Sequence, residues 1–430
     1  MSFVATHPPQ VDLLLRVYRA MLSAVDPRRV VAAHLPAPPA GRTVVVGLGK
    51  AAAAMAQAVE ANWPGELSGV VVVPQGGALP LRRLQVIESS HPVPDERSVQ
   101  AARALLDAVA GLGPDDLVIA LVSGGGSALV ALPVDGLALA DKQRITKALL
   151  ARGAAIHEMN TVRKHLSAIK GGRLAAAAAP ARVVSLVISD IPGDDPALVA
   201  SGPTLATGAT PRDALDILRR YDIDPGDALA RLLQSAHDAG VRPDDPRLAG
   251  NDHHVVASAW DGLAAAAGLA RAEGIACHVL GDALEGEARD LAVAHAGIAQ
   301  SVARHGAPFA APCLLLSGGE ATVTLRGDGR GGRNTEFALA LALALEHAPA
   351  PARVHALSAG TDGLDGRAGA AGAWIAPDSL ARARALGLAP RDMLDRNDSA
   401  TLFDRLGALV HTGPTHTNVN DFRAILIEVP

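Results

Sequence analysis

The stretch from Leu117 to Leu129 restricts the fold of this chain more than any other. An apolar run, LVIAL, is followed by three consecutive glycines between two serines, and then by the apolar pair AL. This pattern predicts a buried strand, a tight turn and the start of a helix. The turn consists of Ser123, Gly124, Gly125, Gly126 and Ser127.

The same turn is suited to hold an anion. Glycines lack a Cβ, so their backbone N–H groups can approach a ligand closely, and the flanking hydroxyls can join them. At the start of a helix such groups form a cradle for a phosphate. A glycine-rich turn that binds nothing would have the same sequence, so the neighbouring motifs have to separate the two alternatives.

Strand-like and helix-like segments alternate around this turn. The sequence predicts strands at residues 42–46, 70–73, 84–88 and 182–188, and helices at residues 51–61, 97–109, 141–152 and 161–179. Residues 11–35 predict a further helix that breaks near Pro27. Alternation at this spacing indicates βαβ units and a mostly parallel sheet, so we expect an α/β fold.

A second set of strands and helices follows a polar, proline-containing connector at residues 203–250. Strands are predicted at residues 254–257, 276–280, 312–317, 321–325, 354–358 and 424–429, and helices at residues 259–272, 285–304 and 334–345. Because 430 residues exceed what one core usually organises, we expect two domains, residues 1–245 and 246–430.

Composition excludes several classes of protein. The net charge is −5 and no stripe of Lys and Arg is present, which argues against nucleic-acid binding. The two cysteines, Cys277 and Cys313, cannot staple a chain of this size, which fits a reducing compartment. The start of the chain lacks the pattern of a signal peptide, and no apolar stretch reaches the roughly 18 residues that span a bilayer. We therefore expect a soluble, cytoplasmic protein without membrane contact.

The motif GLGKAA at residues 47–52 follows the first predicted strand. It satisfies the G-x-G-x-x-A form of the dinucleotide fingerprint, which also requires an acidic residue at the end of the second strand. That strand ends in VVVVPQGGA and has no carboxylate, which weighs against NAD. Lys50 stands at the start of a predicted helix and could clamp a phosphate or a carboxylate. A solvated lysine in a turn is the simpler alternative.

Acidic residues gather in SDIPGDDP, directly after the strand at residues 182–188. The carboxyl ends of strands are where open α/β sheets bind ligands, and carboxylates that face phosphates there usually hold Mg²⁺. Asp190 is the best placed, whereas Asp194 and Asp195 could equally be turn or helix-start residues.

A basic segment, NTVRKHLSAIKGG, precedes this acidic one. Arg163 and Lys170 are seven residues apart and would share one face of a helix, which Gly171 and Gly172 stop or bend. That face would point either at a phosphate or into solvent.

The second half carries its own polar loops, each after a predicted strand. Arg333 stands at the glycine-rich start of a helix in GRGGRNTE, and Asp362 and Asp365 lie in the turn GTDGLDG. GGE follows the strand at residues 312–317. The segment HTGPTHTNVND, which includes Thr415 and Asn418, is rich in hydroxyls and amides and suits a polyhydroxy or carboxylate ligand. Loops from both halves that face one cleft would explain why so many are glycine-rich.

Taken together, these motifs resemble the MOFRL family of glycerate 2-kinases, whose members are sometimes labelled hydroxypyruvate reductases. The matching segments run in order from about residue 45 to the end of the chain: GLGKAA, SGGGSAL, NTVRKHLSAIKGG, SDIPGDDPALVASGPT, GGEATV, GRGGRNTE, GTDGLDGRAGAAGA and TGPTHTNVND. The resemblance implies phosphorylation of D-glycerate to 2-phosphoglycerate, dependent on ATP and Mg²⁺. It also implies a cleft between a Rossmann-like N-terminal domain and a smaller α/β C-terminal domain, with Lys50 and Arg333 as the leading catalytic candidates.

The chemistry of the residues agrees with that implication, because phosphoryl transfer needs charge neutralisation and alignment more than covalent help. We expect the glycine turn to hold the ATP phosphates and Asp190, with Asp194, to hold Mg²⁺. Lys50 and Arg333 would close on the transferred phosphoryl group and the glycerate carboxylate from opposite domains. Further substrate contacts are expected from Asp362, Thr415 and Asn418. Asp190, Asp194 or Asp362 could be the general base, or the reaction needs none.

Two alternatives belong to other classes of protein. One is an NAD(P)H-dependent hydroxypyruvate reductase, and the other is a non-catalytic regulator that binds sugar phosphates. The first needs a ribose-binding acid that the sequence lacks, and the second has little use for Lys50, Arg333 and several aspartates at separate strand ends. The expected partners are D-glycerate and ATP, and the chain could form a homodimer.

Overall fold

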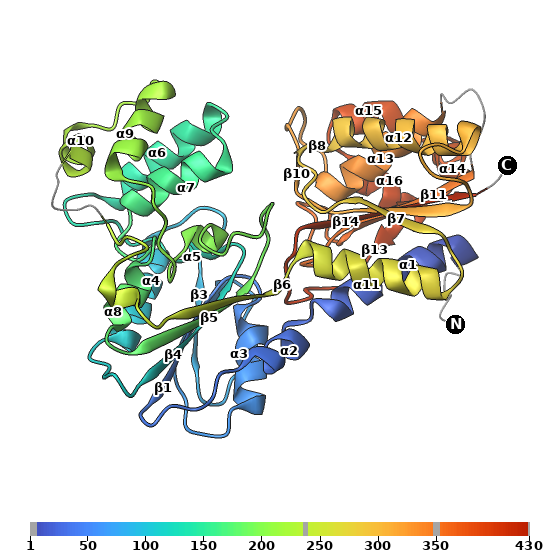
Figure 1. Ribbon diagram of the computed structural model, residues 1–430. Helices are drawn as coiled ribbons and strands as arrows, with labels where there is room; N and C mark the ends of the chain where they lie inside the picture. The colour runs from blue at the N-terminus through green and yellow to red at the C-terminus, as the bar shows by residue number, and fades with distance from the viewer. Residues whose placement is uncertain (1–6, 235–239, 347–352, 429–430) are drawn as a thin grey trace. The chain divides into compact units, whose positions relative to one another are not determined.

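The structure is a computed structural model that describes residues 7–234, 240–346 and 353–428. The chain forms two compact units (Figure 1). The N-terminal unit is Pro27–Val256, and the C-terminal unit is Met1–Asp26 together with Ala257–Pro430. This division differs from the expected one at residue 245. Helix α1 (Pro9–Ala24) packs with the C-terminal residues, and strand β6 (Asp252–Ala257) completes the sheet of the N-terminal unit.

A six-stranded sheet organises the N-terminal unit, with the strand order β3-β2-β1-β4-β5-β6. Each neighbouring pair from β3 to β5 is parallel, which confirms the predicted parallel α/β fold. The remaining strands of this sheet are β1 (Thr43–Leu48), β2 (Ser68–Pro74), β3 (Gln85–Ser89), β4 (Leu117–Ser123) and β5 (Arg182–Ile188). All residues of β1 and β4 are buried, as the continuous apolar runs require.

Helices cover both faces of this sheet. Helix α3 packs on one face, and α4 and α8 pack on the other around an aliphatic core. The helices of this layer are α2 (Pro27–Val30), α3 (Ala52–Asn62), α4 (Glu96–Val109), α5 (Gly126–Leu129) and α8 (Arg173–Ala178). Three short 3₁₀ turns, Ala32–His34, Val199–Ser201 and Pro246–Leu248, link them.

Four further helices of the N-terminal unit gather around an apolar cluster of their own (Figure 1). They are α6 (Leu139–Ala151), α7 (Ile156–His165), α9 (Pro211–Arg220) and α10 (Asp227–Gln234). Part of the expected connector at residues 203–250 therefore packs on α6 and α7. The single helix predicted over residues 161–179 is wrong. Helix α7 ends at His165 and α8 begins at Arg173. Directly before α8, Gly171 and Gly172 adopt positive φ angles of 62° and 82°, which a continuous α-helix does not contain.

The C-terminal unit contains a second six-stranded sheet, of order β13-β12-β11-β14-β9-β7. Its strands are β7 (Cys277–Gly281), β9 (Cys313–Ser317), β11 (Arg353–Gly360), β12 (Gly372–Ile375), β13 (Leu409–Val410) and β14 (Asp421–Glu428). Strands β8 (Gly286–Glu287) and β10 (Ala321–Thr322) pair separately. Strand β14 begins three residues before the predicted strand at 424–429, and residue 429 lies outside the described residues.

The direction of the strands brings the predicted loops of this unit together. Strand β14 is antiparallel to both β9 and β11, so β9 and β11 run in the same direction. Their carboxyl ends therefore meet at the edge of the sheet where β14 begins. The loops GGE and GTDGLDG leave that edge, and HTGPTHTNVN leads back into it.

Helices α1 and α11 (Ala259–Ala272) lie side by side on one face of this sheet, and α12 (Ala288–His305) and α13 (Arg333–Glu346) lie on the other (Figure 1). The sequence predicted most of these helices, but not α14 (Ser379–Ala385), α15 (Pro390–Asp395) or α16 (Ser399–Leu406). Strands β12 and β13 were also missed. Each of these elements except α16 has seven residues or fewer, too few to display a clear period. In the part of the chain that the structure describes, no helix has the length and apolar character needed to cross a bilayer.

Candidate active site

The loops after β1 and β4 form the centre of the site in the N-terminal unit. These two strands are adjacent in the sheet, and the chain continues outward from them in opposite directions. A reversal of this kind opens a crevice at the carboxyl ends of the strands, where α/β proteins bind ligands. The loop after β1 carries Lys50, and the loop after β4 is the glycine turn, Ser123–Ser127.

The loop after β1 supports the glycine turn through its own backbone. The N–H of Lys50 donates to the carbonyl of Gly124 (2.9 Å), and the N–H of Ala51 donates to Ser123 Oγ (3.0 Å). Gly49 has a φ of 125°, and a Cβ there would lie 2.2 Å from Ser123 Oγ. Glycine is therefore needed at residue 49 for the close contact of the two loops. Ser123 thus has a structural contact within the turn where the sequence predicted a ligand contact.

The glycine turn presents donors that have no protein partner. Within the described residues, the N–H groups of Gly124, Gly125 and Gly126 donate no hydrogen bond. Gly125 has a φ of 80°, and a Cβ there would lie 3.2 Å from His91 Nε2 and 3.3 Å from Lys50 Cγ. The side chains of Lys50 and His91 therefore flank the turn. The helix that follows, α5, has four residues, so the anion-binding groups are those of the turn itself.

Ser127 connects the glycine turn to two other predicted motifs. Lys170 Nζ donates to Ser127 Oγ (2.7 Å) and to the Ser127 carbonyl (2.5 Å). Ser127 Oγ also lies 3.0 Å from Ser201 Oγ, which donates to Asn160 Oδ1 (3.0 Å). The basic segment, the glycine turn and the segment SDIPGDDPALVASGPT thus meet at one hydroxyl group.

Lys170 is buried, so the solvated alternative for this residue is wrong. Lys170 lies in a loop after α7. The prediction that it shares a helix face with Arg163 is therefore wrong. Burial lowers the pKa of the Lys170 ammonium well below its ordinary value, and the positive charges of Lys142 and Arg163 lower it further.

Asp190 lies next to the glycine turn at the same edge of the sheet. Ile188 at the end of β5 pairs with Ser123 at the end of β4, and Asp190 is two residues further on. Asp194 lies in the following turn with a φ of 53°, and both aspartates are half-buried. Asp195 Oδ1 instead accepts from the N–H of Ala197 (2.9 Å) and shapes the turn.

A metal cage made of protein groups alone is absent from residues 7–234, 240–346 and 353–428, in which no three His, Cys, Asp or Glu side chains are placed to hold an ion. Mg²⁺ commonly uses one or two carboxylates and completes its shell with water and substrate phosphates. The two carboxylates of Asp190 and Asp194, beside a turn that could hold a phosphate, fit this coordination preference.

In the C-terminal unit, Arg333 is the central cation. It is the first residue of α13, its Nε donates to Asp421 Oδ1 (2.7 Å), and its Nη1 donates to Glu320 Oε1 (2.6 Å). Burial lowers the pKa of the Arg333 guanidinium, but the two carboxylates outweigh that effect and raise it above its ordinary value. Within the described residues Nη2 donates no hydrogen bond, so the fixed side chain keeps donors for a ligand.

Asp421 holds this region together although sequence reasoning gave it no role. It is fully buried at the start of β14 and accepts from Asn334 Nδ2 (2.9 Å), Arg423 Nη2 (2.9 Å) and the N–H of Ala321 (3.1 Å). The only hint in the sequence is its place at the end of the polar segment before an apolar strand. Asp421 therefore joins the loop after β9, α13 and β14.

Asp365 caps α13, which fixes the position of Arg333. Its two carboxylate oxygens accept from the N–H groups of Asn334 (2.8 Å) and Thr335 (2.9 Å). Burial raises the pKa of Asp365 to about 6, against the lowering effect of these hydrogen bonds. Its contacts are those of a helix cap.

Asp362 and Thr415, two of the predicted substrate contacts, lie next to each other. The N–H of Thr415 donates to the Asp362 carbonyl (3.2 Å), and the Asp362 carboxylate accepts from the N–H of Leu364 (3.0 Å). Asn418 is buried in the same polar segment. Tyr18 of α1 donates to the carbonyl of Gly360 (2.7 Å) at the base of these loops.

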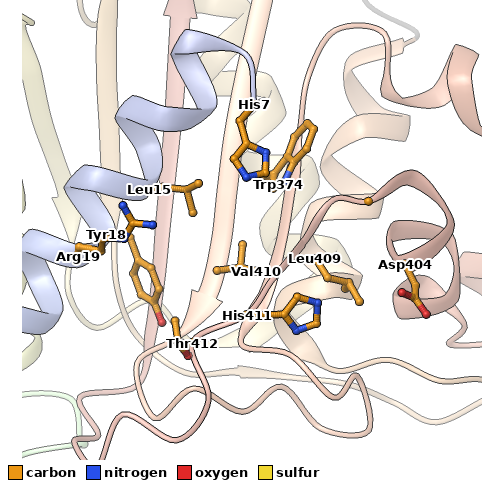
Figure 2. Close-up of a pocket in the computed structure, with 11 residues that line it drawn as sticks. His7, Leu15, Tyr18, Arg19, Trp374, Asp404, Leu409, Val410, His411 and Thr412 are labelled. Atoms are coloured by element: carbon orange, nitrogen blue, oxygen red, sulfur yellow. The ribbon is translucent and has the colours of Figure 1, made fainter. Parts of the chain in front are cut away.

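A cavity of about 340 Å³ opens elsewhere in the C-terminal unit (Figure 2). Figure 2 shows His7 beside Trp374, and the two ring centroids are 5.8 Å apart. Tyr18 and Thr412 also line it. None of the individually predicted site residues is among the described residues that line this cavity, but Thr412 belongs to the polar segment HTGPTHTNVND, so the cavity adjoins that loop.

Sequence reasoning missed Lys142 in the N-terminal unit. This residue is buried on α6 with Ile145 and Leu149, at helical spacings of three and four residues. The spacing was available in the sequence, since a lysine in an apolar stripe is the pattern of a buried cation.

Comparisons with known proteins match both halves of the chain. A model described as a domain of unknown function (DUF4147) matches residues 13–234, and the model of the MOFRL family matches residues 313–421. A protein of Agrobacterium vitis that is named as a hydroxypyruvate reductase is 53% identical over 97% of this chain and 94% of its own. D-glycerate 2-kinase of Thermotoga maritima is 38% identical over 95% of this chain and 96% of its own.

A solved structure matches the whole fold. The crystal structure of a glycerate kinase from Thermotoga maritima has a TM-score of 0.85 and 37% sequence identity. The match covers 98% of this chain and 100% of that chain.

Proposed function

Because this chain belongs to the MOFRL family, we propose that it transfers the terminal phosphoryl group of ATP to the 2-hydroxyl of D-glycerate. The phosphoryl acceptor follows from the relative named D-glycerate 2-kinase, which is similar over almost the full length of both chains. The nucleotide is the donor that a kinase of this kind requires.

The observation that carries this proposal is the contrast between the two glycine loops. The N–H groups of Lys50, Ala51 and Ala52 after β1 all donate to protein oxygens. By contrast, the N–H groups of Gly124, Gly125 and Gly126 after β4 have no partner within the described residues. A phosphate therefore finds open donors in the loop after β4, next to cations, and not in the loop after β1 where the dinucleotide fingerprint would bind it.

The residues of the N-terminal unit would bind and align the nucleotide. Gly124, Gly125 and Gly126 donate to phosphate oxygens, and Lys50 beside the turn neutralises charge that develops on the transferred group. Asp190 and Asp194 would hold Mg²⁺, which when bound shields the phosphate charges from one another. Asp190 or Asp194 would take the proton of the attacking hydroxyl, or the transfer would proceed without a base.

The residues of the C-terminal unit would bind and orient glycerate. Arg333 is held by two carboxylates, and its remaining donors suit a carboxylate or phosphoryl group. Asp362, Thr415 and Asn418 would contact the hydroxyl groups, and Asp362 is a further candidate base. The expected cleft between the domains stays a prediction.

The name of the Agrobacterium vitis relative favours a second candidate, a reductase of hydroxypyruvate that uses a nicotinamide cofactor. That reaction needs a carboxylate at the end of β2 to bind the ribose, but β2 ends at Pro74 and Gln75 follows. The paired N–H groups after β1 also leave no pyrophosphate cradle there. A function as a non-catalytic regulator would not explain the placement of Arg333, Asp190 and Lys50.

The decisive experiment is ³¹P NMR of the purified protein with ATP, Mg²⁺ and D-glycerate, run beside an absorbance assay with NADH and hydroxypyruvate. We expect a phosphomonoester signal of 2-phosphoglycerate and no loss of NADH. A signal of 3-phosphoglycerate would correct the position of transfer. Consumption of NADH without a phosphomonoester would replace the kinase proposal with the reductase.

We also place the protein in the cytoplasm, and a homodimer stays a prediction. Cys277 and Cys313 are buried and form no disulfide, which supports a reducing compartment.

A further inference from the structure

Lys142 is a buried cation that the proposed mechanism does not use. It lies on α6 with 4% of its surface exposed, and its Nζ has no hydrogen-bond partner in the described part of the chain. An ammonium group that is buried without a partner is unfavourable, because it gives up its water and gains no other contact, and an anionic ligand would supply one.

Two further cations surround the same place. Lys170 is 1% exposed and reaches Ser127 of the glycine turn, and Arg163 of α7 is half-buried. Burial, together with a smaller effect of the Arg163 charge, lowers the pKa of the Lys142 ammonium to about 7. The positive charges of Lys142 and Arg163 also lower the pKa of Lys170, so the three groups lie close to one another.

No carboxylate compensates these charges. Among residues 7–234, 240–346 and 353–428, none forms an ion pair with Lys142, Arg163 or Lys170. Glu158 on α7 is engaged elsewhere, with Arg220 and with Tyr221 Oη. A cluster of three cations with this little compensation attracts an anion of more than one charge.

We propose that Lys142, Arg163 and Lys170 form a binding pocket for the phosphate chain of the nucleotide, adjoining the glycine turn at Ser127. Naming the nucleotide as the ligand rests on the proposed function, whereas the polyphosphate chemistry rests on the cluster itself. Three cations and the open N–H groups of the turn match a chain of phosphates better than a single carboxylate, which brings one charge. Lys170 also ties the pocket to Ser127, so the bound chain is aligned with the turn.

The test is calorimetric titration of the full-length protein with inorganic triphosphate, ATP and adenosine. Lys142→Met removes the charge but keeps the length of the side chain, and Lys170→Met does so for the second ammonium group. Lys147→Met is the matched control, because this lysine is exposed on the same helix. We expect each of the first two variants to bind triphosphate and ATP roughly 100-fold more weakly than the wild type. The affinity of the control should stay within about twofold of the wild type.

Two measurements separate loss of the pocket from loss of the fold. Lys142→Met should melt at or above the temperature of the wild type in the absence of ligand, because it removes an uncompensated buried charge. Adenosine, which has no phosphate, should bind the variants and the wild type equally. If Lys142→Met melts lower, the Lys170→Met titration decides.

The outcomes distinguish this proposal from the proposed function. If both variants lose triphosphate binding and the wild type does not phosphorylate glycerate, the pocket is supported and the kinase proposal is wrong. Phosphorylation of glycerate with unchanged ATP affinity in both variants would keep the kinase and overturn the pocket. A wild type that binds no triphosphate would also overturn it.

Discussion

Two carboxylates fix the guanidinium of Arg333 before any substrate binds. Asp421 and Glu320 hold its Nε and Nη1, and the helix that it begins is capped by Asp365. This preorganisation is what electrostatic stabilisation of a transition state requires, because no reorganisation is needed when charge develops. The sequence singled out Arg333 and also Asp365, whereas the contacts that fix the guanidinium, and the role of Asp421, came only from the structure.

We predict that Arg333→Ala lowers kcat for glycerate phosphorylation on the order of a thousandfold, since one preorganised donor group is lost. Arg330→Ala is the control, because Arg330 precedes the same helix but is exposed and paired with Asp404. Steady-state kinetics on both variants is the measurement. Near-normal kcat in Arg333→Ala would show that this arginine has no role in the transfer.

A second prediction at this scale concerns pH. The folded-state pKa of Lys142 is about 7 against an ordinary value of 10.5, so between these values the folded protein binds fewer protons than the unfolded chain. The free energy of unfolding therefore rises with pH over that window, by at most about 1.4 kcal/mol for each pH unit. Burial is the larger cause of the lowered pKa of Lys142, and the charge of Arg163 adds to it.

The variant Lys142→Met lacks this contribution. Its melting temperature should exceed that of the wild type at pH 7, and the difference should shrink towards pH 10. Differential scanning fluorimetry of both proteins across that range is the measurement. A difference that stays constant with pH would mean that the Lys142 ammonium does not titrate in this way.

At the scale of elements, the glycine turn depends on the loop after β1. Gly49 has a positive φ and allows the two loops to touch. Gly49→Ala should therefore displace the glycine turn and lower the affinity for ATP roughly tenfold or more. Gly76→Ala is the control, because Gly76 also has a positive φ but faces open space. Both variants carry a backbone strain of about 1 kcal/mol, and only the first should lose affinity in a titration with ATP. Equal ATP affinities of Gly49→Ala and Gly76→Ala would show that the glycine turn does not bind the nucleotide.

At the scale of the whole molecule, the first helix belongs to the unit formed by the end of the chain. Apolar residues of α1 are buried against α11, and a Cβ on Gly262 of α11 would lie 2.6 Å from Met21 Cγ. Met21→Ala should therefore destabilise the C-terminal unit by about 2–5 kcal/mol. The N-terminal unit has its own cores and should keep its stability.

Hydrogen–deuterium exchange resolves the two units in one experiment. In Met21→Ala we expect faster exchange in α11 and in the strands of the C-terminal unit, with unchanged protection in β1 and β4. Faster exchange throughout residues 27–256 would contradict the assignment of α1. Met55→Ala, in the core of the other unit, should show the opposite pattern.

The sequence by itself determined the parallel sheet of the N-terminal unit and most of the loops to which we assign the chemistry. Strand period, glycine turns and the residues after strand ends are local properties, so the glycine turn, Lys50 and Arg333 could be predicted from short segments. The helix predicted over residues 161–179 was wrong for a local reason as well, because the prediction continued through Gly171 and Gly172, where the helical conformation is interrupted.

Only the tertiary structure decided which charges are buried and what surrounds them. The burial of Lys142 and Lys170 results from packing between α6, α7 and the glycine turn, which come from separate parts of the chain. The role of Asp421 likewise depends on the antiparallel register of β14 with β9 and β11. Such contacts join residues far apart in the chain, so no local pattern specifies them, and burial changes the chemistry of each group that they enclose.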